Sequence, residues 1–468
     1  MIVEQMYTNC LAQAAYWIES DGEAAVVDPL RDYHIYIEKA KNRNVKIKYI
    51  LETHFHADFV SGHLDLSKAT GAPIIYGPEA TTGFDCQILN DREQIKIGKL
   101  TIEVLHTPGH TIESSCYLLK DEHNTDYCLF SGDTLFVGDV GRPDLLDKNQ
   151  QYTKEIMASW LYDSLYKKIM HLSDNVILYP AHGPGSSCGK NLGPETFSTI
   201  GKQKEENYAL QSLSRETFIE QVLEGIKPPP GYFFEDAFLN KNGYENIDLL
   251  KEKGLKNLSL AEFDFLQKEG VLIIDSRIPD IFQEGFIPSS INIGLNGQYA
   301  IWAAELFNLD RKIMLVCTAG QEEESVIRLT RVGFNNIIGF LEGGFIGWKN
   351  AGKGIDMIVS IDAEEFCIDY KLDAIQLIDV RKESEYDTLH LANAKLISLN
   401  ELINRTTEVE KNKSAIYVHC AGGYRSMIAA SILKRAGFDL VKNVLGGFNL
   451  IKEDKSISFS SNIASNVI

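Results

Sequence analysis

The sequence predicts an α/β protein in which a two-sheet α/β sandwich precedes two doubly wound α/β domains. Three observations support this prediction. The first 200 residues alternate short apolar runs with polar loops, the second half contains an internal repeat, and 468 residues exceed what one hydrophobic core usually organises. The hydrophobic fraction of 44% and the charged fraction of 24% are those of a folded globular protein.

Short apolar segments bounded by Gly, Pro or Asp indicate strands in the first 200 residues. Several end in His or Asp followed by a turn, which would gather polar side chains at one rim of the two sheets. A charged, helix-prone stretch over 202–223 and a Pro-Pro-Pro-Gly break at 228–231 predict a connector. The predicted strands are 24–27, 47–51, 73–76, 100–105, 115–119, 127–130 and 176–179.

The second half contains two copies of one pattern, and strands that alternate with helices predict parallel, doubly wound sheets. Each copy has an apolar strand ending in D-x-R, a second strand ending near a cysteine, a Gly-Phe pair and a Gly-Gly pair. We expect domains at 1–240, 241–355 and 356–468, a helix from Met427 to Arg435, and a frayed tail from Ser456. The residues that carry the pattern are Asp275, Arg277, Cys317, Gly333 and Gly343 in the first copy and Asp379, Arg381, Cys420, Gly437 and Gly446 in the second.

Charge and composition exclude several classes of function. A net charge of -19 argues against binding to nucleic acid or to an anionic membrane surface. No apolar run reaches the length of a membrane span, and the first residues show no secretory signal. The eight cysteines form no C-x-x-C pair, so we expect free thiols in a reducing cytoplasm.

Four clusters of His and Asp, each in a turn after an apolar strand, predict a metal site. They are 53–58, 107–110, 131–134 and 180–183. A lone histidine is usually a core or surface residue, but four such clusters in order indicate metal ligands. The order H-x-H-x-D, PGH, SGD and AHG resembles the metallo-β-lactamase superfamily, an αββα sandwich, over essentially the first 200 residues.

Many members of that superfamily bind two metals, and a His after the Asp then binds the second. Here that position is Phe59, whose ring has no lone pair to donate, so a two-metal site should be crippled. The persulfide dioxygenase branch fits one metal better. The resemblance implies one Fe(II) per chain in a two-His, one-carboxylate triad of His54, His110 and Asp133, with positions left for substrate and O2. His56, Asp58 and His182 would then either orient the ligands from around them or face the substrate.

Two further segments lie close to this predicted centre. Arg142, in Gly141-Arg-Pro-Asp144, resembles the family's G-R-x-D stretch and predicts an anion clamp that helps to hold a persulfide. Cys188 and Lys190 follow His182 in a glycine-rich loop. We expect the Cys188 thiol to approach the iron, with Lys190 lowering its pKa; the alternative is a flexible loop with an incidental thiol.

The segment from His419 to Ser426 predicts a sulfur-carrying cysteine, because a loop before a helix directs backbone N–H groups inward. Those donors would favour the thiolate of Cys420, and Arg425 would add positive charge. Residues 360–452 resemble rhodanese sulfurtransferases, which implies that Cys420 carries a persulfide sulfur. The resemblance also implies that the loop residues Gly422, Gly423 and Tyr424 bind substrate.

The middle copy resembles a rhodanese over residues 260–350, but its loop departs from the pattern. Counting back without gaps from Gly333 and Gly437 pairs Cys317 with Ala421, one place from the catalytic position. Three glutamates, 322–324, replace the arginine. We therefore predict a degenerate, structural module.

The domain order resembles the CstB-type multidomain sulfurtransferases, a family of persulfide dioxygenase–rhodanese fusions. This resemblance implies a homo-oligomer (dimer or tetramer) that oxidises a low-molecular-weight thiol persulfide with O2 to sulfite. Cys420 would then pass sulfur to sulfite and give thiosulfate. Two alternatives stay open: a glyoxalase II-like thioester hydrolase with a binuclear zinc site, and a non-catalytic sulfur carrier or scaffold.

Overall fold

The computed structural model describes residues 1–145, 152–190, 192–211, 214–372, 375–411 and 414–462. The chain forms two compact units. The first is Met1–Leu249 with Thr330–Asn335, and the second is Leu250–Leu329 with Asn336–Ile468. Each unit is described by itself.

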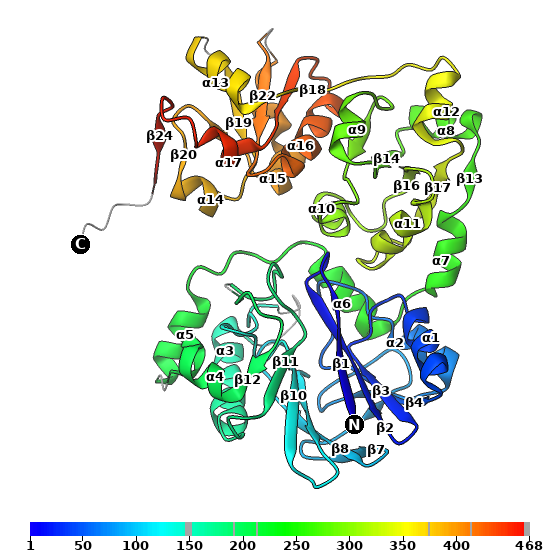
Figure 1. Ribbon diagram of the computed structural model, residues 1–468, viewed down its shortest axis with the longest axis vertical. Helices are drawn as coiled ribbons and strands as arrows, with labels where there is room; N and C mark the ends of the chain where they lie inside the picture. Colours follow the sequence, from blue (N-terminus) through cyan, green and yellow to red (C-terminus); the bar gives the residue numbers. More distant parts are fainter. Residues whose placement is uncertain (146–151, 191, 212–213, 373–374, 412–413, 463–468) are drawn as a thin grey trace. The chain divides into compact units, whose positions relative to one another are not determined.

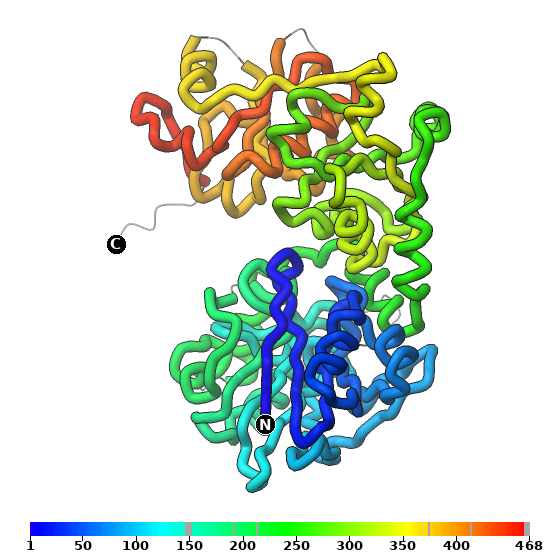
Figure 2. The backbone as a smooth tube through the Cα atoms, turned by 45° about the vertical axis from the view of Figure 1, so that its right-hand side comes forward, coloured from blue at the N-terminus to red at the C-terminus, as the bar shows by residue number. Residues whose placement is uncertain are grey.

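The first unit contains two six-stranded sheets (Figure 1). One sheet has the order β1-β2-β3-β4-β5-β6, and the other β12-β11-β10-β9-β8-β7. Figure 2 shows the antiparallel hairpin of β1 and β2 in dark blue. The strands are β1 (Ile2–Thr8), β2 (Gln13–Ser20), β3 (Glu23–Val27), β4 (Lys46–Leu51), β5 (Ile74–Tyr76), β6 (Gln87–Ile88), β7 (Gln94–Ile97), β8 (Leu100–His106), β9 (Ser115–Lys120), β10 (Asp126–Gly132), β11 (Ile177–Pro180) and β12 (Ser198–Thr199).

Alternating side chains of the two sheets form the core of this unit. Tyr16 and Val27 of the first sheet belong to the same buried cluster as Val104 and Phe130 of the second, so the sheets pack face to face. The other face of the second sheet packs against α3, η1 and α5. The predicted αββα sandwich is confirmed. The helices are α1 (His34–Arg43), α2 (His63–Thr70), α3 (Lys154–Ser164), the π-helix η1 (Leu165–Ile169), α4 (Ile200–Glu206), the 3₁₀-helix η2 (Tyr208–Leu210), α5 (Arg215–Leu223), α6 (Phe233–Asn242) and α7 (Ile247–Gly254).

The charged, helix-prone stretch over 202–223 is helical, but it forms α4, η2 and α5 rather than one helix. Asn207 ends α4 with an extended backbone (ψ 120°), and its side chain accepts the Ala209 N–H to begin η2. The helix therefore breaks where an Asn side chain competes for a backbone donor. Part of the predicted stretch, 212–213, lies outside the described residues.

The second unit consists of two similar modules, each with a five-stranded parallel sheet, so the predicted repeat is confirmed. The sheet orders are β13-β17-β16-β14-β15 in the middle module (257–350) and β18-β23-β22-β19-β21 in the last module (359–460). The middle module contains β13 (Asn257–Leu258), α8 (Leu260–Lys268), β14 (Leu272–Asp275), α9 (Pro279–Gln283), β15 (Ser290–Asn292), α10 (Tyr299–Leu306), β16 (Ile313–Val316), α11 (Glu322–Thr330), β17 (Ile337–Leu341) and α12 (Gly344–Asn350).

The last module contains β18 (Val359–Ile361), α13 (Ala363–Leu372), β19 (Gln376–Asp379), α14 (Glu383–Thr388), β20 (His390–Leu391), β21 (Lys395–Leu396), α15 (Leu399–Arg405), the 3₁₀-helix η3 (Thr406–Glu408), β22 (Ile416–His419), α16 (Tyr424–Arg435), β23 (Val441–Val444), α17 (Gly447–Ile451) and β24 (Phe459–Ser460). The predicted helix from Met427 is thus the inner part of α16. The predicted fraying from Ser456 is wrong up to residue 462, because β24 pairs with β20 and Asn462 bonds to Asp387. Among the described residues, no helix is long and apolar enough to cross a bilayer.

Candidate functional site

The three predicted metal ligands meet because each lies just after a strand of the sandwich. His54 follows β4, His110 follows β8, and Asp133 follows β10. Asp133 Oδ2 lies 3.4 Å from His110 Nε2 and 3.7 Å from His54 Nε2. These three atoms are buried and have no hydrogen-bond partner among the described residues. Three unpaired lone-pair donors that converge in this way fit a metal ion, because leaving them unsatisfied is costly.

Gly132 allows Asp133 to reach this position. Its φ is +53°, and a Cβ on it would lie 2.6 Å from Thr53 Oγ1. A glycine is therefore required where the end of β10 meets the loop that carries His54.

Hydrogen bonds fix the tautomers of both histidine ligands. Thr53 Oγ1 donates its hydrogen to Asp28 Oδ2 at 2.9 Å, so it accepts from His54 Nδ1 at 2.9 Å. The carbonyl of Arg142 accepts from His110 Nδ1 at 2.8 Å. Each Nδ1 therefore carries the proton, and each Nε2 offers a lone pair to the centre.

The charge states also suit a metal. Burial lowers the pKa of His54 well below its usual range and lowers that of His110, so both imidazoles are neutral. Burial alone would raise the pKa of Asp133, but His182, His54 and His110 outweigh it and hold that pKa below its usual range. Two neutral imidazoles and a carboxylate are the protonation states that bind a metal.

His56, Asp58 and His182 form a second group of metal-ligand side chains beside the first. His182 lies between two carboxylates, with Nδ1 2.7 Å from Asp133 Oδ1 and Nε2 2.8 Å from Asp58 Oδ2. Burial alone would lower the pKa of His182, but Asp133 and Asp58 raise it well above its usual range. The Phe59 ring packs 4.5 Å from the His56 ring, centre to centre.

Several supporting residues escaped the sequence prediction. The carboxylate of Asp28 accepts from Thr53 N at 2.8 Å and lies 3.2 Å from His56 Nε2. Glu52 lies 3.6 Å from the same His56 nitrogen and 3.2 Å from His63 Nδ1. Asp28 directly follows the buried strand β3, as the predicted ligands follow their own strands. This position in the sequence could have identified it as a site residue.

Asn240 on α6 holds the metal-site loop. Its Nδ2 donates to the carbonyls of His56 and Phe59, each at 2.7 Å, and its Oδ1 accepts from Ser61 N at 2.8 Å. Asn240 is 1% exposed. The sequence places it in a connector, where nothing in its pattern signals a contact with residues about 180 positions earlier.

The Cys188 thiol lies at the edge of the centre, as predicted. Its sulfur and ligand atoms of Asp133 and His182 all lie within 4.8 Å of one another. The predicted lowering of its pKa by Lys190 is wrong, because burial, with Asp58 and Asp133, raises the pKa of Cys188 well above its usual range. The Lys190 ammonium instead donates to the carbonyls of Gln221 and Glu224.

Arg142 holds the Cys188 loop, and its role as an anion clamp stays a prediction. Its guanidinium bonds both carboxylate oxygens of Asp144, at 2.7 and 2.8 Å, and the carbonyls of Ser187 and Lys227. Its backbone N–H donates to the Cys188 carbonyl at 2.9 Å. Because its own carbonyl accepts from His110, this one residue links a metal ligand to the thiol loop.

In the last module, Cys420 lies in a turn between β22 and α16. The thiol is 1% exposed, and its sulfur accepts the Gly423 N–H at 3.1 Å. Gly447 has a φ of +52°, and a Cβ there would lie 2.3 Å from the Cys420 carbonyl, so glycine is required at this approach. The neighbouring Phe448 N–H donates to the same carbonyl at 2.7 Å.

Two predicted loop residues, Arg425 and Tyr424, have side-chain partners within the protein. The Arg425 guanidinium bonds both carboxylate oxygens of Glu385 at 2.7 and 2.8 Å, so its positive charge is balanced. The Tyr424 hydroxyl donates to the Gly294 carbonyl of the middle module, and substrate binding by this loop residue stays a prediction. Gly422 is exposed, and a Cβ there would meet nothing within 4 Å.

The D-x-R motif is a buried ion pair in both modules. Asp275 and Arg277 pair at 2.6 Å, and Asp379 and Arg381 at 2.7 Å. In the last module the guanidinium also stacks 3.8 Å from the Phe448 ring centre. The motif therefore supports the fold of each module, whether or not its loop carries an active cysteine.

The predicted one-place offset of Cys317 is wrong. Asp275 pairs with Val316 across the sheet as Asp379 pairs with His419, so Cys317 occupies the position of Cys420. The gapless count failed because 15 residues separate Cys317 from Gly333, whereas 16 separate Cys420 from Gly437.

The middle loop nevertheless uses its N–H groups differently. The Gly320 N–H, three residues after Cys317, donates to the Glu322 carboxylate at 2.8 Å. In the last module the N–H at the same distance from the cysteine, that of Gly423, donates to the sulfur. Burial raises the pKa of Cys317 to about 11, although the Ser276 and Ser325 hydroxyls oppose the shift.

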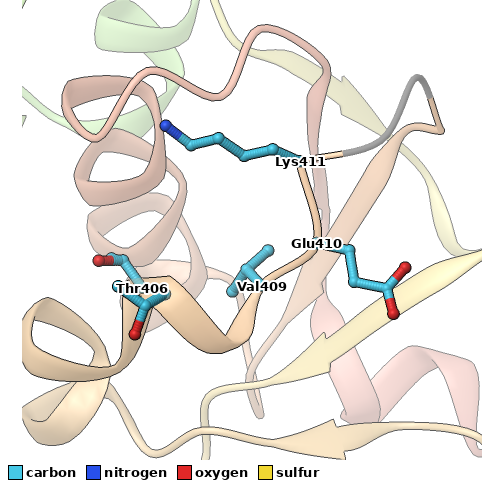
Figure 3. A pocket seen from close by; sticks show the side chains of 5 residues that line it. Thr406, Val409, Glu410 and Lys411 are labelled. Atoms are coloured by element: carbon cyan, nitrogen blue, oxygen red, sulfur yellow. The ribbon is translucent and has the colours of Figure 1, made fainter.

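A surface hollow in the last module is separate from both sites. It is lined by Thr406, Thr407, Val409, Glu410 and Lys411 (Figure 3). None of these is a candidate site residue.

The fold and the converging ligands define a metalloprotein of the αββα class that carries two further α/β modules. Comparison with known families supports this assignment of the fold. The model described as the metallo-β-lactamase superfamily matches residues 8–84, and that of the rhodanese-like domain matches 260–351 and 367–454.

Individual relatives span different parts of the chain. A solved metallo-β-lactamase of Staphylococcus aureus is 30% identical with a TM-score of 0.64, and the match covers 73% of this chain and 98% of that one. A probable hydroxyacylglutathione hydrolase of Schizosaccharomyces pombe is 34% identical over 35% of this chain and 60% of its own length. The mouse mitochondrial persulfide dioxygenase ETHE1 is 29% identical over 44% of this chain and 73% of its own length. The chain belongs to the metallo-β-lactamase superfamily and carries two rhodanese-like domains.

Proposed function

We propose that this chain is a persulfide dioxygenase with an attached sulfurtransferase. A low-molecular-weight persulfide, O2 and water would give the thiol and sulfite, and Cys420 persulfide would pass its outer sulfur to sulfite to give thiosulfate. The observation that carries the proposal is the convergence of His54 Nε2, His110 Nε2 and Asp133 Oδ2, all buried and unpaired among the described residues. The likeness to the mouse persulfide dioxygenase supports it.

One Fe(II) per chain would be held by His54, His110 and Asp133, and ferrous iron in such a triad supplies dioxygen chemistry. The residues of the chain prepare this site. Thr53 and the Arg142 carbonyl keep each imidazole in the ligating tautomer, and His182 holds the second oxygen of Asp133. Cys188 adds a buried thiol at the edge, and burial raises the pKa of that thiol well above its usual range.

At the second site, the Gly423 N–H faces the Cys420 sulfur and would hold a sulfane sulfur on it. The middle module, whose Gly320 N–H is bound by Glu322, would be a structural partner. All eight cysteines are free, which supports a reducing cytoplasm. We also propose a homo-oligomer, dimer or tetramer.

Two variants test the proposal. His54→Ala should lose iron, measured after anaerobic purification, and lose persulfide-dependent oxygen uptake by at least about a hundredfold. The exposed His123→Ala is the control and should keep both. Cys420→Ser should keep oxygen uptake while the product shifts from thiosulfate to sulfite. Retained iron and oxygen uptake in His54→Ala would refute the proposal.

A glyoxalase II-like thioester hydrolase with two zinc ions is the second candidate. It is supported by the likeness to the hydroxyacylglutathione hydrolase and by the adjacent group of His56, Asp58 and His182. Two zinc ions per chain with thioester hydrolysis and no oxygen uptake would establish it. Phe59, packed against His56, argues for one metal.

A further inference from the structure

Tyr424, the first residue of α16, extends from the sulfur-carrying loop into the middle module. Its hydroxyl donates to the Gly294 carbonyl at 2.7 Å. Its ring lies so close to Gly297 that a Cβ there would be 2.4 Å from the ring Cζ. The Tyr424 ring therefore packs directly against the backbone of Gly297, where any side chain would collide with it.

The segment that receives Tyr424, residues 293–298, is held from within the middle module. Arg328 on α11 donates to the carbonyls of Leu295, at 2.6 Å, and Gly297, at 2.8 Å. Arg328 is 6% exposed. A buried guanidinium with two carbonyl acceptors makes this segment a firm support rather than a loose loop.

The rest of α16 is attached to the same edge of the middle module. The Asn292 N–H donates to Ser431 Oγ at 3.1 Å, and Arg435 donates to the Ser289 carbonyl at 2.6 Å. Figure 1 shows α15 and α16 beside α10, and α10 contacts α15. The helix that begins at the Cys420 loop is therefore fixed at its start, middle and end.

We propose that segment 293–298 of the middle module positions the sulfur-carrying loop of the last module through Tyr424. By holding the start of α16, it would keep the Gly423 N–H 3.1 Å from the Cys420 sulfur. The degenerate module would then act on sulfur transfer without a reactive cysteine of its own. This inference rests on the proposed role of Cys420, and in it Tyr424 is a positioning residue.

Gly297→Ala tests the contact, because its backbone is not left-handed and the three atoms nearest to the added methyl group all belong to the Tyr424 ring. Gly354→Ala is the matched control, since a Cβ there meets nothing within 4 Å. We expect Gly297→Ala to lower kcat for sulfur transfer from thiosulfate to cyanide about tenfold, with KM for cyanide within about twofold. Equal kcat values for the two variants would overturn the inference.

A double variant separates positioning from general destabilisation. In a Tyr424→Ala background there is no ring to displace, so Gly297→Ala should change kcat by less than about twofold. A full tenfold loss in that background would show that the effect does not pass through Tyr424, and would overturn the inference. Far-UV circular dichroism confirms that each variant is folded at the assay temperature.

The test also distinguishes this inference from the proposed function. If wild type transfers no sulfur, or Cys420→Ser transfers as well as wild type, the proposed role of Cys420 fails. The alkylation rate of Cys420 by iodoacetamide still reports on the loop. We expect Gly297→Ala to raise that rate at least about threefold over Gly354→Ala, because a displaced loop exposes a thiol that is now 1% exposed. Equal alkylation rates would overturn the positioning inference.

Discussion

At the scale of single residues, the two rhodanese-like loops differ in the hydrogen-bond partner of one backbone N–H group. Gly320 and Gly423 each lie three residues after a cysteine at the same strand end. The Gly423 N–H faces sulfur, whereas the Gly320 N–H is taken by Glu322. A carboxylate at a helix start is favourable for the helix, but here it occupies the donor that a sulfur ligand would need.

This difference predicts that Cys317 is a slow nucleophile. Burial raises its pKa from 9.0 to about 11, so the thiolate forms only as the pH rises through that value. Its alkylation rate, followed by peptide mass spectrometry, should increase about tenfold per pH unit between pH 8 and 10. Cys317→Ser should leave sulfur transfer within about twofold of wild type. A rate that levels off below pH 9, or loss of transfer in Cys317→Ser, would contradict this view.

At the scale of elements, the sequence predicted the strand ends better than the contacts between distant segments. Seven apolar runs became β3, β4, β5, β8, β9, β10 and β11, and the clusters after them met at one site. Local pattern sufficed there because each ligand follows its own strand. The edge strands β6 and β12 have two residues each, too short for any periodicity to indicate.

What the sequence could not give are contacts set by tertiary packing. Arg142 was predicted to hold an anion, but a nearby carboxylate and two carbonyls satisfy its guanidinium. Composition cannot reveal such partners, because the Lys227 carbonyl lies 85 residues away. The register of Cys317 was likewise hidden, because the segment between the cysteine and the Gly-Phe pair is one residue shorter in the middle copy, and a gapless count does not allow for that.

Helix α6 offers a test of an element that the sequence placed in a connector. Asn240→Ala would leave two carbonyls and one N–H of the metal-site loop without their partner. We expect it to lower the free energy of unfolding by roughly 3 kcal/mol, and to lower iron content about tenfold. Urea unfolding and metal analysis measure the two effects.

The same helix provides the control. Asn242 is exposed, and its amide donates to the Phe238 carbonyl of its own helix at 2.9 Å. Asn242→Ala should change the free energy of unfolding by less than about 0.5 kcal/mol. If both variants lost the same stability and kept the same iron, α6 would have no role in holding the metal-site loop.

At the scale of the whole molecule, the two candidate sites lie in different compact units. The metal ligands belong to the unit of Met1–Leu249, and Cys420 to the unit that ends at Ile468. Each unit has its own buried clusters, one between the two six-stranded sheets and others within each module. Units with separate cores can unfold separately, so binding at one site should stabilise one unit.

Calorimetry in the presence and absence of ferrous iron tests this separation. Without metal, three buried ligand atoms lack partners, so iron should raise one unfolding transition and leave the other in place. At a hundredfold excess of iron over Kd the gain is about 2.7 kcal/mol, which corresponds to roughly 5–10 °C for a unit of this size. His54→Ala should abolish the shift of the unfolding transition. Cys420→Ser should show the same shift as wild type, because Cys420 lies in the other unit. An equal shift of both transitions, or a shift that survives in His54→Ala, would place the iron elsewhere than on the triad.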